Sequence, residues 1–207
     1  MTRVLILLLA ALPSRADDAP ALWEKGAKLQ KLSADGSGGE GPAWHPELGV
    51  LTSGRGGIHR FHEGKSSIHR KDAGTNGLLF DKEGRLLACE PVQRRVTRTD
   101  AKGRIEVLAE KLGGKRFNQP NDLTVDAKGR VFFSDPVYGP RGHMELKDEK
   151  GRPVEGVYRI DAPGKVVRVL GRDDVDRPNG VLVSGNGKWL YVADNNNDEG
   201  GTRKLWR

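Results

Sequence analysis

Four oxygen-bearing side chains recur at a fixed distance from a glycine along this sequence: Glu40, Asn76, Asn121 and Asn179. The glycine follows eight residues after each asparagine and nine residues after the glutamate. A carboxylate and several amide carbonyls are the ligands that hard cations prefer, and Ca²⁺ accepts about six to eight of them in irregular geometry. If the fold brings these positions together, they predict a cation site.

The shared register carries more weight than any single residue. One Asn-Gly pair is by itself typical of a tight turn. Asn76, which lacks the proline that precedes Asn121 and Asn179, could therefore be purely structural. Zinc is disfavoured, because the single Cys89 and the five histidines show no zinc-ligand spacing. The Gly-x-Ser-x-Gly elbow of serine hydrolases is also missing from the sequence.

Strands and turns must position these residues. Asn121 opens a predicted hairpin in which strand Leu123–Val125 passes through the turn Asp126–Gly129 into strand Val131–Phe133. The other three positions open similar hairpins. Two more short strands follow each hairpin, except that the fourth is followed by one, Thr202–Arg207. The units begin 36, 45 and 58 residues apart, and the longest spacing contains a polar insertion at 137–154.

Such repeats, about 40–50 residues long with four short strands and no helical period, predict an all-β protein with the β-propeller fold. The sequence contains three complete blades and three strands of a fourth. It could form a compact four-bladed ring or part of a larger one, and the stop inside a strand favours the second, in which the ring is incomplete. The alternating segment Ala27–Ser33 is predicted as an edge strand that could fill an outer position, and Thr52–Gly57 is predicted as a loop. The first strand of each blade lines the central channel of a propeller. The four oxygen-bearing positions would therefore converge.

Acidic residues also recur at the end of the second strand of three units: Glu90, Asp135 and Asp194. We expect these residues to cap or tie loops at the opposite face of the propeller rather than to take part in catalysis. Cys89 cannot form an intrachain disulfide, and we expect it to be a small buried hydrophobic residue.

The N-terminus has the pattern of a secretory signal. Arg3 precedes the apolar run Val4–Leu12, which is too short to span a bilayer, and small residues around Ala16 suit a signal peptidase. We therefore expect residues 1–16 to be a cleaved signal peptide and residues 17–207 to form one partial propeller domain. The mature protein would be secreted or periplasmic, without a membrane span.

The net charge of +7 raises the question of nucleic-acid binding. However, the basic residues are scattered among 28 acidic residues, and no basic run contains interleaved aromatic residues. The sequence therefore argues against a nucleic-acid partner. Nothing in it indicates an oligomeric state.

A family resemblance is carried by four segments taken together: Glu40–Trp44, Arg116–Asp122, Arg177–Gly180 and Tyr191–Asp194. They resemble the gluconolactonase and senescence marker protein (regucalcin-like) family, and its exported bacterial gluconolactonases in particular. The resemblance covers roughly residues 28–207. It implies a six-bladed propeller with one divalent cation, usually Ca²⁺, on the axis. It also implies hydrolysis of a sugar lactone such as gluconolactone to the open acid.

By position, the resemblance implies that Glu40, Asn121 and Asn179 are three of four metal ligands. The fourth is an aspartate that also acts as the general acid or base in the family. It has no counterpart before Arg207, so it would be expected beyond that residue. The segment Thr52–Gly57 also lacks the acidic residue that is usual in the family.

The resemblance implies further roles close to these ligands. Arg116 and Asn118, together with Asn121, would bind the sugar hydroxyls. Asp122 would lie just outside the metal ligands.

The sequence therefore predicts part of a metal-dependent lactone hydrolase, in which a cation stabilises the developing oxyanion and a carboxylate accepts a proton from water. The 207-residue chain itself is expected to be inactive or nearly so. One alternative is a non-catalytic propeller that binds a sugar or a protein. Another is a relative similar to strictosidine synthase or to organophosphate hydrolases, because the same scaffold hosts several functions.

Overall fold

A computed structural model describes residues 24, 26–31 and 39–207, so the predicted signal peptide at residues 1–16 lies outside the described residues. The chain divides into two units, residues 1–32 and 33–207. In the first unit, residues 27–31 are exposed and form no strand, so the predicted edge strand Ala27–Ser33 is wrong over those residues. An alternating pattern is not sufficient without a neighbouring strand to supply hydrogen-bond partners. No helix among the described residues is long and apolar enough to cross a membrane.

The second unit consists of antiparallel sheets whose strands pair in chain order. The first sheet contains β1 (Glu40–His45), β2 (Gly49–Gly54), β3 (Gly57–His62) and β4 (Lys65–Lys71). The second contains β5 (Leu78–Phe80), β6 (Leu86–Glu90), β7 (Arg95–Thr99) and β8 (Ile105–Ala109). The third contains β11 (Leu123–Val125), β12 (Val131–Asp135), β13 (Gly156–Ala162) and β14 (Lys165–Leu170). The fourth contains β15 (Pro178–Val183), β16 (Leu190–Asn195) and β17 (Arg203–Trp206), and a small hairpin is formed by β9 (Lys111–Leu112) and β10 (Lys115–Arg116).

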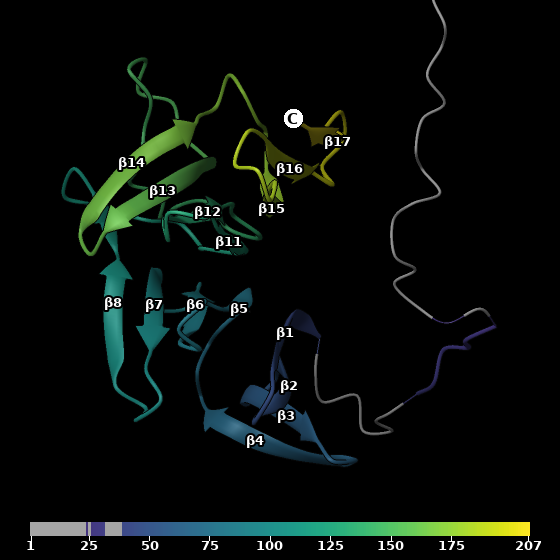
Figure 1. The fold of residues 1–207 in the computed structure, drawn as a ribbon. Coiled ribbons are helices and arrows are strands. Elements are labelled where there is room, and N and C mark those ends of the chain that lie inside the picture. The colour runs from purple at the N-terminus through teal and green to yellow at the C-terminus, as the bar shows by residue number, and fades with distance from the viewer. Residues whose placement is uncertain (1–23, 25, 32–38) are drawn as a thin grey trace, which may run out of the picture. The chain divides into compact units, whose positions relative to one another are not determined.

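These sheets are the blades of a propeller-like arrangement, and the prediction of an all-β propeller is confirmed. Figure 1 shows the four blades following one another around an arc, with the first strands β1, β5 and β11 toward its inner side. The expectation of three complete blades and three strands of a fourth is also confirmed. The predicted loop at Thr52–Gly57 is wrong. Strand β2 continues to Gly54, which pairs with Gly57 on β3, so the connection is only two residues long.

The hydrophobic core lies between successive blades, because each middle strand contributes one face to each neighbour. All five residues of β6 are buried. Leu86 and Ala88 pack toward residues of the first blade, whereas Leu87 and Cys89 pack toward the third blade. This division follows from the two-residue period of a strand, in which neighbouring side chains point to opposite faces. The expectation that Cys89 is a buried hydrophobic residue is confirmed.

Aromatic side chains fill the interface between the second and third blades. The rings of Phe117, Phe133 and Tyr158 have centroids 5.0–5.4 Å apart, and all three side chains are fully buried. Edge-to-face and offset arrangements at these distances stabilise aromatic pairs beyond the burial of their surface. Phe117 precedes the inner strand of the third blade. The cluster therefore anchors the segment that leads to Asn121.

Four turns share the sequence Asp-x-x-Gly-Arg and a common structure: Asp81–Arg85, Asp100–Arg104, Asp126–Arg130 and Asp148–Arg152. In each turn, one carboxylate oxygen accepts hydrogen bonds from two backbone N–H groups, and the other accepts the arginine Nε–H at 2.6–2.7 Å. The glycine has a positive φ, between 73° and 78°. Sequence analysis recognised the glycine but not the aspartate–arginine pair.

Candidate functional site

The inner strands of the first three blades approach one another closely, because a glycine follows the leading residue of the first two. A Cβ at Gly41 would lie 2.5 Å from the carbonyl oxygen of Asn76, and a Cβ at Gly77 would lie 2.7 Å from the carbonyl oxygen of Asn121. The Gly77 N–H donates a hydrogen bond to that Asn121 oxygen at 2.7 Å. These glycines therefore permit backbone contact between neighbouring blades. The leading residues of the first three blades are brought side by side.

The third and fourth blades are joined at the same end by side chains. The carboxylate of Asp122 accepts a hydrogen bond from the Val181 N–H at 3.1 Å. The hydroxyl of Ser134 donates to the Asn179 carbonyl oxygen. Asp122 thus lies between the two inner strands and next to both candidate ligands Asn121 and Asn179.

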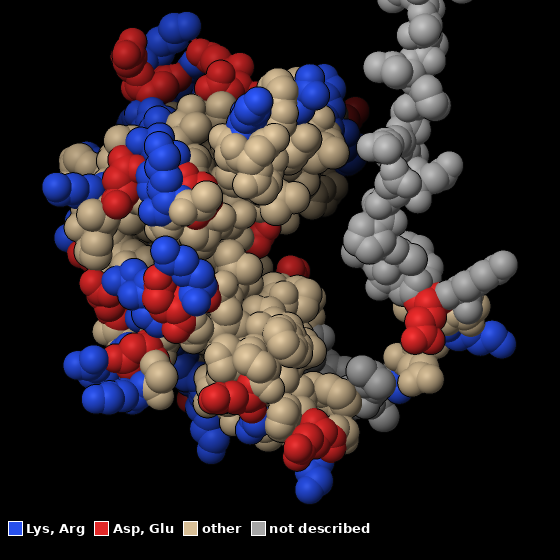
Figure 2. Space-filling model, in the orientation of Figure 1, with Lys and Arg blue, Asp and Glu red and all other residues tan. Residues whose placement is uncertain are grey.

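Glu40 belongs to the same group, although it comes from the first blade. Burial raises the pKa of Asp122, and the negative charge of Glu40 raises it further. The Glu40 charge also contributes to the raised pKa of Tyr138, whose hydroxyl accepts a hydrogen bond from Asn179 at 2.8 Å. Figure 2 shows the inner side of the arc hollowed, with acidic atoms exposed in the recess. We call the group Glu40, Asn121, Asp122, Tyr138 and Asn179 the inner recess.

The donors of the inner recess fit a hard cation. Within the described residues, neither Glu40 nor Asp122 forms an ion pair, and the Asn121 side chain makes no hydrogen bond. Two carboxylates close together without a basic partner favour a bound cation, and amide oxygens complete a donor set that suits Ca²⁺. The described part of the chain contains no group of three His, Cys, Asp or Glu that could hold a metal. The site would therefore depend on the amides, and the three metal ligands Glu40, Asn121 and Asn179 stay a prediction.

The two residues predicted to bind sugar are held by the protein itself. The Arg116 guanidinium donates to the carbonyl oxygen of Gln93, and its backbone N–H donates to Glu145. Asn118 is fully buried, and its amide donates to the carbonyl oxygens of Asp135 and Val154 at 3.1 and 2.9 Å. The structure does not bring Asn118 to the surface of the inner recess. Sugar binding by these residues stays a prediction.

Two of the recurring acids, Asp135 and Asp194, fix loops as expected, but at the end where the leading residues lie and not at the opposite face. The third, Glu90, binds strand residues instead of a loop. The Asp135 carboxylate accepts the Asn118 N–H at 2.8 Å. Asp194 accepts the N–H groups of two residues, at 2.6 and 2.9 Å, in the corresponding segment before β15. Glu90 binds Arg70 and Arg95 at 2.7 and 2.6 Å. Asp135 and Asp194 thereby hold the chain that leads into each inner strand.

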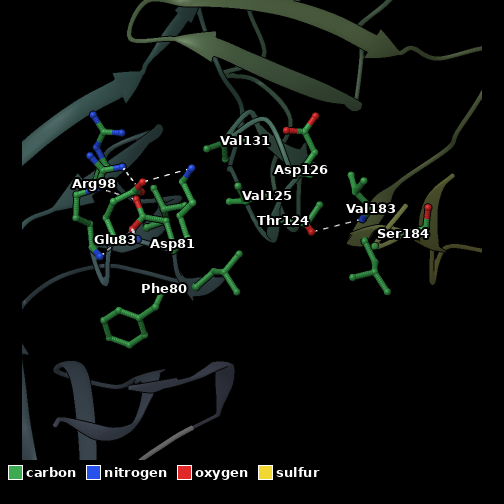
Figure 3. Close-up of a pocket in the computed structure, with 18 residues that line it drawn as sticks. Phe80, Asp81, Glu83, Arg98, Thr124, Val125, Asp126, Val131, Val183 and Ser184 are labelled. Carbon is green, nitrogen blue, oxygen red and sulfur yellow. Dashed lines mark hydrogen bonds and ion pairs between the residues drawn. The ribbon is translucent and has the colours of Figure 1, made fainter. Parts of the chain in front are cut away.

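A cavity of about 470 Å³ lies at the other end of the inner strands, among the turns of the second, third and fourth blades. Figure 3 shows Val125, Val131 and Val183 facing it, with Thr124 hydrogen-bonded to the Val183 N–H. None of the candidate residues lines it, and its charged residues Asp81 and Asp126 are paired with the arginines of their own turns. The cavity is therefore separate from the inner recess, where the predicted site residues Glu40, Asn121 and Asn179 lie.

Known proteins resemble this chain over most of its described length. A family model described as the SMP-30/Gluconolactonase/LRE-like region matches residues 38–200. The chain belongs to this family. Gluconolactonase of Zymomonas mobilis is 28% identical over 164 residues, which are 79% of this chain and 44% of that protein. A gluconolactonase structure from Xanthomonas campestris has a TM-score of 0.65 and 31% identity, over 81% of this chain and 58% of that one.

The chain thus spans about half of the length of these relatives. Regucalcin of Agrobacterium tumefaciens, which is described as a calcium-binding protein, has a TM-score of 0.52 and 20% identity over 82% of this chain and 58% of that one. This last likeness shows the fold alone. The expected family membership is confirmed.

Sequence analysis missed two features of the inner recess. The Asn76-Gly77 pair could have been a simple turn and Gly41 received no role, although both glycines permit the contact between blades. Tyr138 was assigned only to the start of a polar insertion. Its position directly after a second strand, next to Pro136 and Val137, gave no periodic signal.

Proposed function

We propose that this chain forms the cation-binding part of a lactone hydrolase that opens a sugar lactone to the corresponding acid. The observation that supports this most is the inner recess, where one exposed carboxylate and the amides of two further blades meet in a member of the gluconolactonase family. Glu40, Asn121 and Asn179 would hold the cation, with Ca²⁺ as the first choice. When bound, the cation polarises the lactone carbonyl and stabilises the developing oxyanion.

The protein's own groups position this centre. The Ser134 hydroxyl fixes the Asn179 backbone, and Asp122 fixes Val181 on the same strand. Burial and the Glu40 charge make the Asp122 carboxyl easier to protonate. Asp122 would therefore lie beside the proposed ligands as a carboxyl with a raised pKa, and the residue that abstracts the proton from water is not assigned.

The test combines cation binding with hydrolysis. Calorimetric titration of the metal-free chain with Ca²⁺ is expected to show one site, and Asn179→Ala and Glu40→Gln are expected to weaken it. Proton release from gluconolactone is then measured with Ca²⁺ and with a chelator. The same assay tests the expectation that the 207 residues hydrolyse lactone weakly or not at all.

Each outcome separates the candidate functions. Chelator-sensitive hydrolysis supports the proposal, and hydrolysis that persists in chelator contradicts it. A chain that binds Ca²⁺ but shows no hydrolysis fits both the expected inactivity of the 207 residues and the non-catalytic alternative, and tight binding of a sugar acid would then favour the alternative. Absence of any Ca²⁺ binding would refute the proposed site.

A further inference from the structure

Asn179 can serve as a cation ligand only if its amide presents the oxygen. A side-chain amide has an acceptor oxygen and a donor nitrogen on opposite sides, and rotation by half a turn exchanges them. The Nδ2 atom is a hydrogen-bond donor and cannot bind a cation. The protein must therefore hold Nδ2 away from the cation.

The structure provides one group that does this. Within the described residues, the only hydrogen bond of the Asn179 side chain runs from Nδ2 to the Tyr138 hydroxyl, at 2.8 Å. We infer that Tyr138 is a positioning residue for the cation site, which binds Nδ2 so that Oδ1 faces the cation. This inference rests on the proposed function.

Tyr138 is itself held in place from two sides. Its backbone N–H donates to the Gln119 side-chain oxygen at 2.8 Å, and the Arg177 guanidinium lies over its ring at 5.6 Å from the centroid. Arg177 is 5% exposed and bonded to Asp198 at 2.7 Å. These contacts fix the place of the Tyr138 hydroxyl, and in the structure that hydroxyl accepts its hydrogen bond from Asn179 Nδ2.

The position of Tyr138 does not suggest a packing role. The residue is 37% exposed, unlike the buried Tyr158 of the aromatic cluster. Its hydroxyl lies at the inner recess, where the charge of Glu40 acts on it. Removal of the Tyr138 hydroxyl should therefore leave the fold intact and change only the orientation of the Asn179 side-chain amide. Residues that hydrogen-bond to a metal ligand without binding the metal themselves typically contribute about 10–100-fold to metal affinity.

The experiment compares Tyr138→Phe with Tyr191→Phe. Tyr191 lies on β16 of the fourth blade, and its hydroxyl makes no hydrogen bond within the described residues, so the control removes the same atom without touching the amide. Calorimetric Ca²⁺ titration is expected to show about 10–100-fold weaker binding for Tyr138→Phe and unchanged binding for Tyr191→Phe. Thermal melts of the metal-free proteins verify that both variants fold.

Two further measurements separate positioning from a general structural effect. With Tb³⁺ in place of Ca²⁺, luminescence lifetimes in H₂O and D₂O count bound waters, and Tyr138→Phe should add about one as Asn179 leaves the ion. In an Asn179→Asp background, either carboxylate oxygen can face the cation. The loss caused by Tyr138→Phe should then shrink severalfold.

The outcomes are distinct. If wild-type protein binds Ca²⁺ and Tyr138→Phe binds it equally well, with the same number of waters, the inference is refuted while the proposed function stands. The inference is also refuted if Tyr138→Phe lowers the Ca²⁺ affinity as much in the Asn179→Asp background as in the wild type. If the wild-type chain binds no Ca²⁺, the proposed function fails and the inference fails with it, because no ligand needs positioning.

Discussion

Replacement of Asp135 by asparagine should make the stability of this protein less dependent on pH. The Asp135 side chain is completely buried, and one of its carboxylate oxygens has no hydrogen-bond partner. Burial raises its pKa to about 8, although the N–H groups of Asn118 and Gln119 oppose this increase. Asparagine has nearly the same shape and can accept the same backbone hydrogen bond, but it cannot ionise.

The sign and size of the effect follow from the two pKa values. In the unfolded chain the carboxyl loses its proton near pH 4, whereas in the folded protein it keeps the proton until about pH 8. The contribution of the protonated Asp135 carboxyl to the free energy of unfolding is therefore fully present below about pH 4 and is lost as the pH rises to about 8. A shift of about four units corresponds to roughly 5–6 kcal/mol. We expect a loss of several kcal/mol, which is large against a typical stability of about 5–15 kcal/mol.

Urea unfolding between pH 4.5 and 9, followed by tryptophan fluorescence in the presence of a chelator, measures this loss. The free energy of unfolding of the wild type should fall relative to that of Asp135→Asn by up to about 1.4 kcal/mol per pH unit, and the difference should become constant above about pH 8. Glu149→Gln serves as the charge control, because Glu149 is exposed and its side chain forms no hydrogen bond or ion pair within the described residues. It should follow the wild type throughout.

A constant difference between wild type and Asp135→Asn across this range would refute the argument. That result would mean that Asp135 is ionised in the folded protein. The two backbone N–H donors and the Arg94 charge would then outweigh the burial.

Two other substitutions test the packing that forms the inner recess. Gly77→Ala places a Cβ 2.7 Å from the Asn121 carbonyl oxygen, so it should lower the free energy of unfolding by about 1–3 kcal/mol and weaken Ca²⁺ binding. Gly180→Ala is the control at the equivalent position of the fourth blade. Its Cβ would meet the nearest atom at 3.5 Å, so it should lower the free energy of unfolding much less. Equal losses in chemical denaturation would show that the close approach of the blades is not responsible. Phe133→Ala should cost about 3–5 kcal/mol in the same assay, because it removes a fully buried ring from the aromatic cluster. A loss below about 1 kcal/mol would mean that the cluster collapses around the cavity.

The fold could be predicted because its signals are local and repeated. Hairpins such as Leu123–Val125 with Val131–Phe133 show apolar strands around a glycine turn, and the recurrence of the unit selects a propeller over other all-β folds. The predicted edge strand at Ala27–Ser33 failed over residues 27–31 because a strand also needs a partner. The loop predicted at Thr52–Gly57 failed because the pairing of β2 with β3, and not the residue types, sets the length of that turn.

The candidate site could be predicted only in part. Glu40, Asn121 and Asn179 share a register, and the register placed them at the same end of neighbouring strands. Tyr138 has no such register, and its contact with Asn179 joins residues 41 positions apart. The burial of Asn118 was also beyond the sequence, because it depends on Val154 at the far end of the insertion.

The location of the core between blades, rather than at one centre, has a consequence for how this architecture changes in evolution. Each interface between two blades has its own hydrophobic cluster. Residues such as Leu86 pack against one neighbouring blade, and residues such as Leu87 pack against the other. Among the described residues, no hydrophobic cluster joins three blades. Among the described residues, stability is then close to a sum of nearest-neighbour terms, as in other repeat architectures. A blade can be duplicated, replaced or deleted while distant interfaces keep their packing. The proposed cation site at the inner recess, which takes its ligands from several blades, would be the part that constrains which blades must be present and in which order.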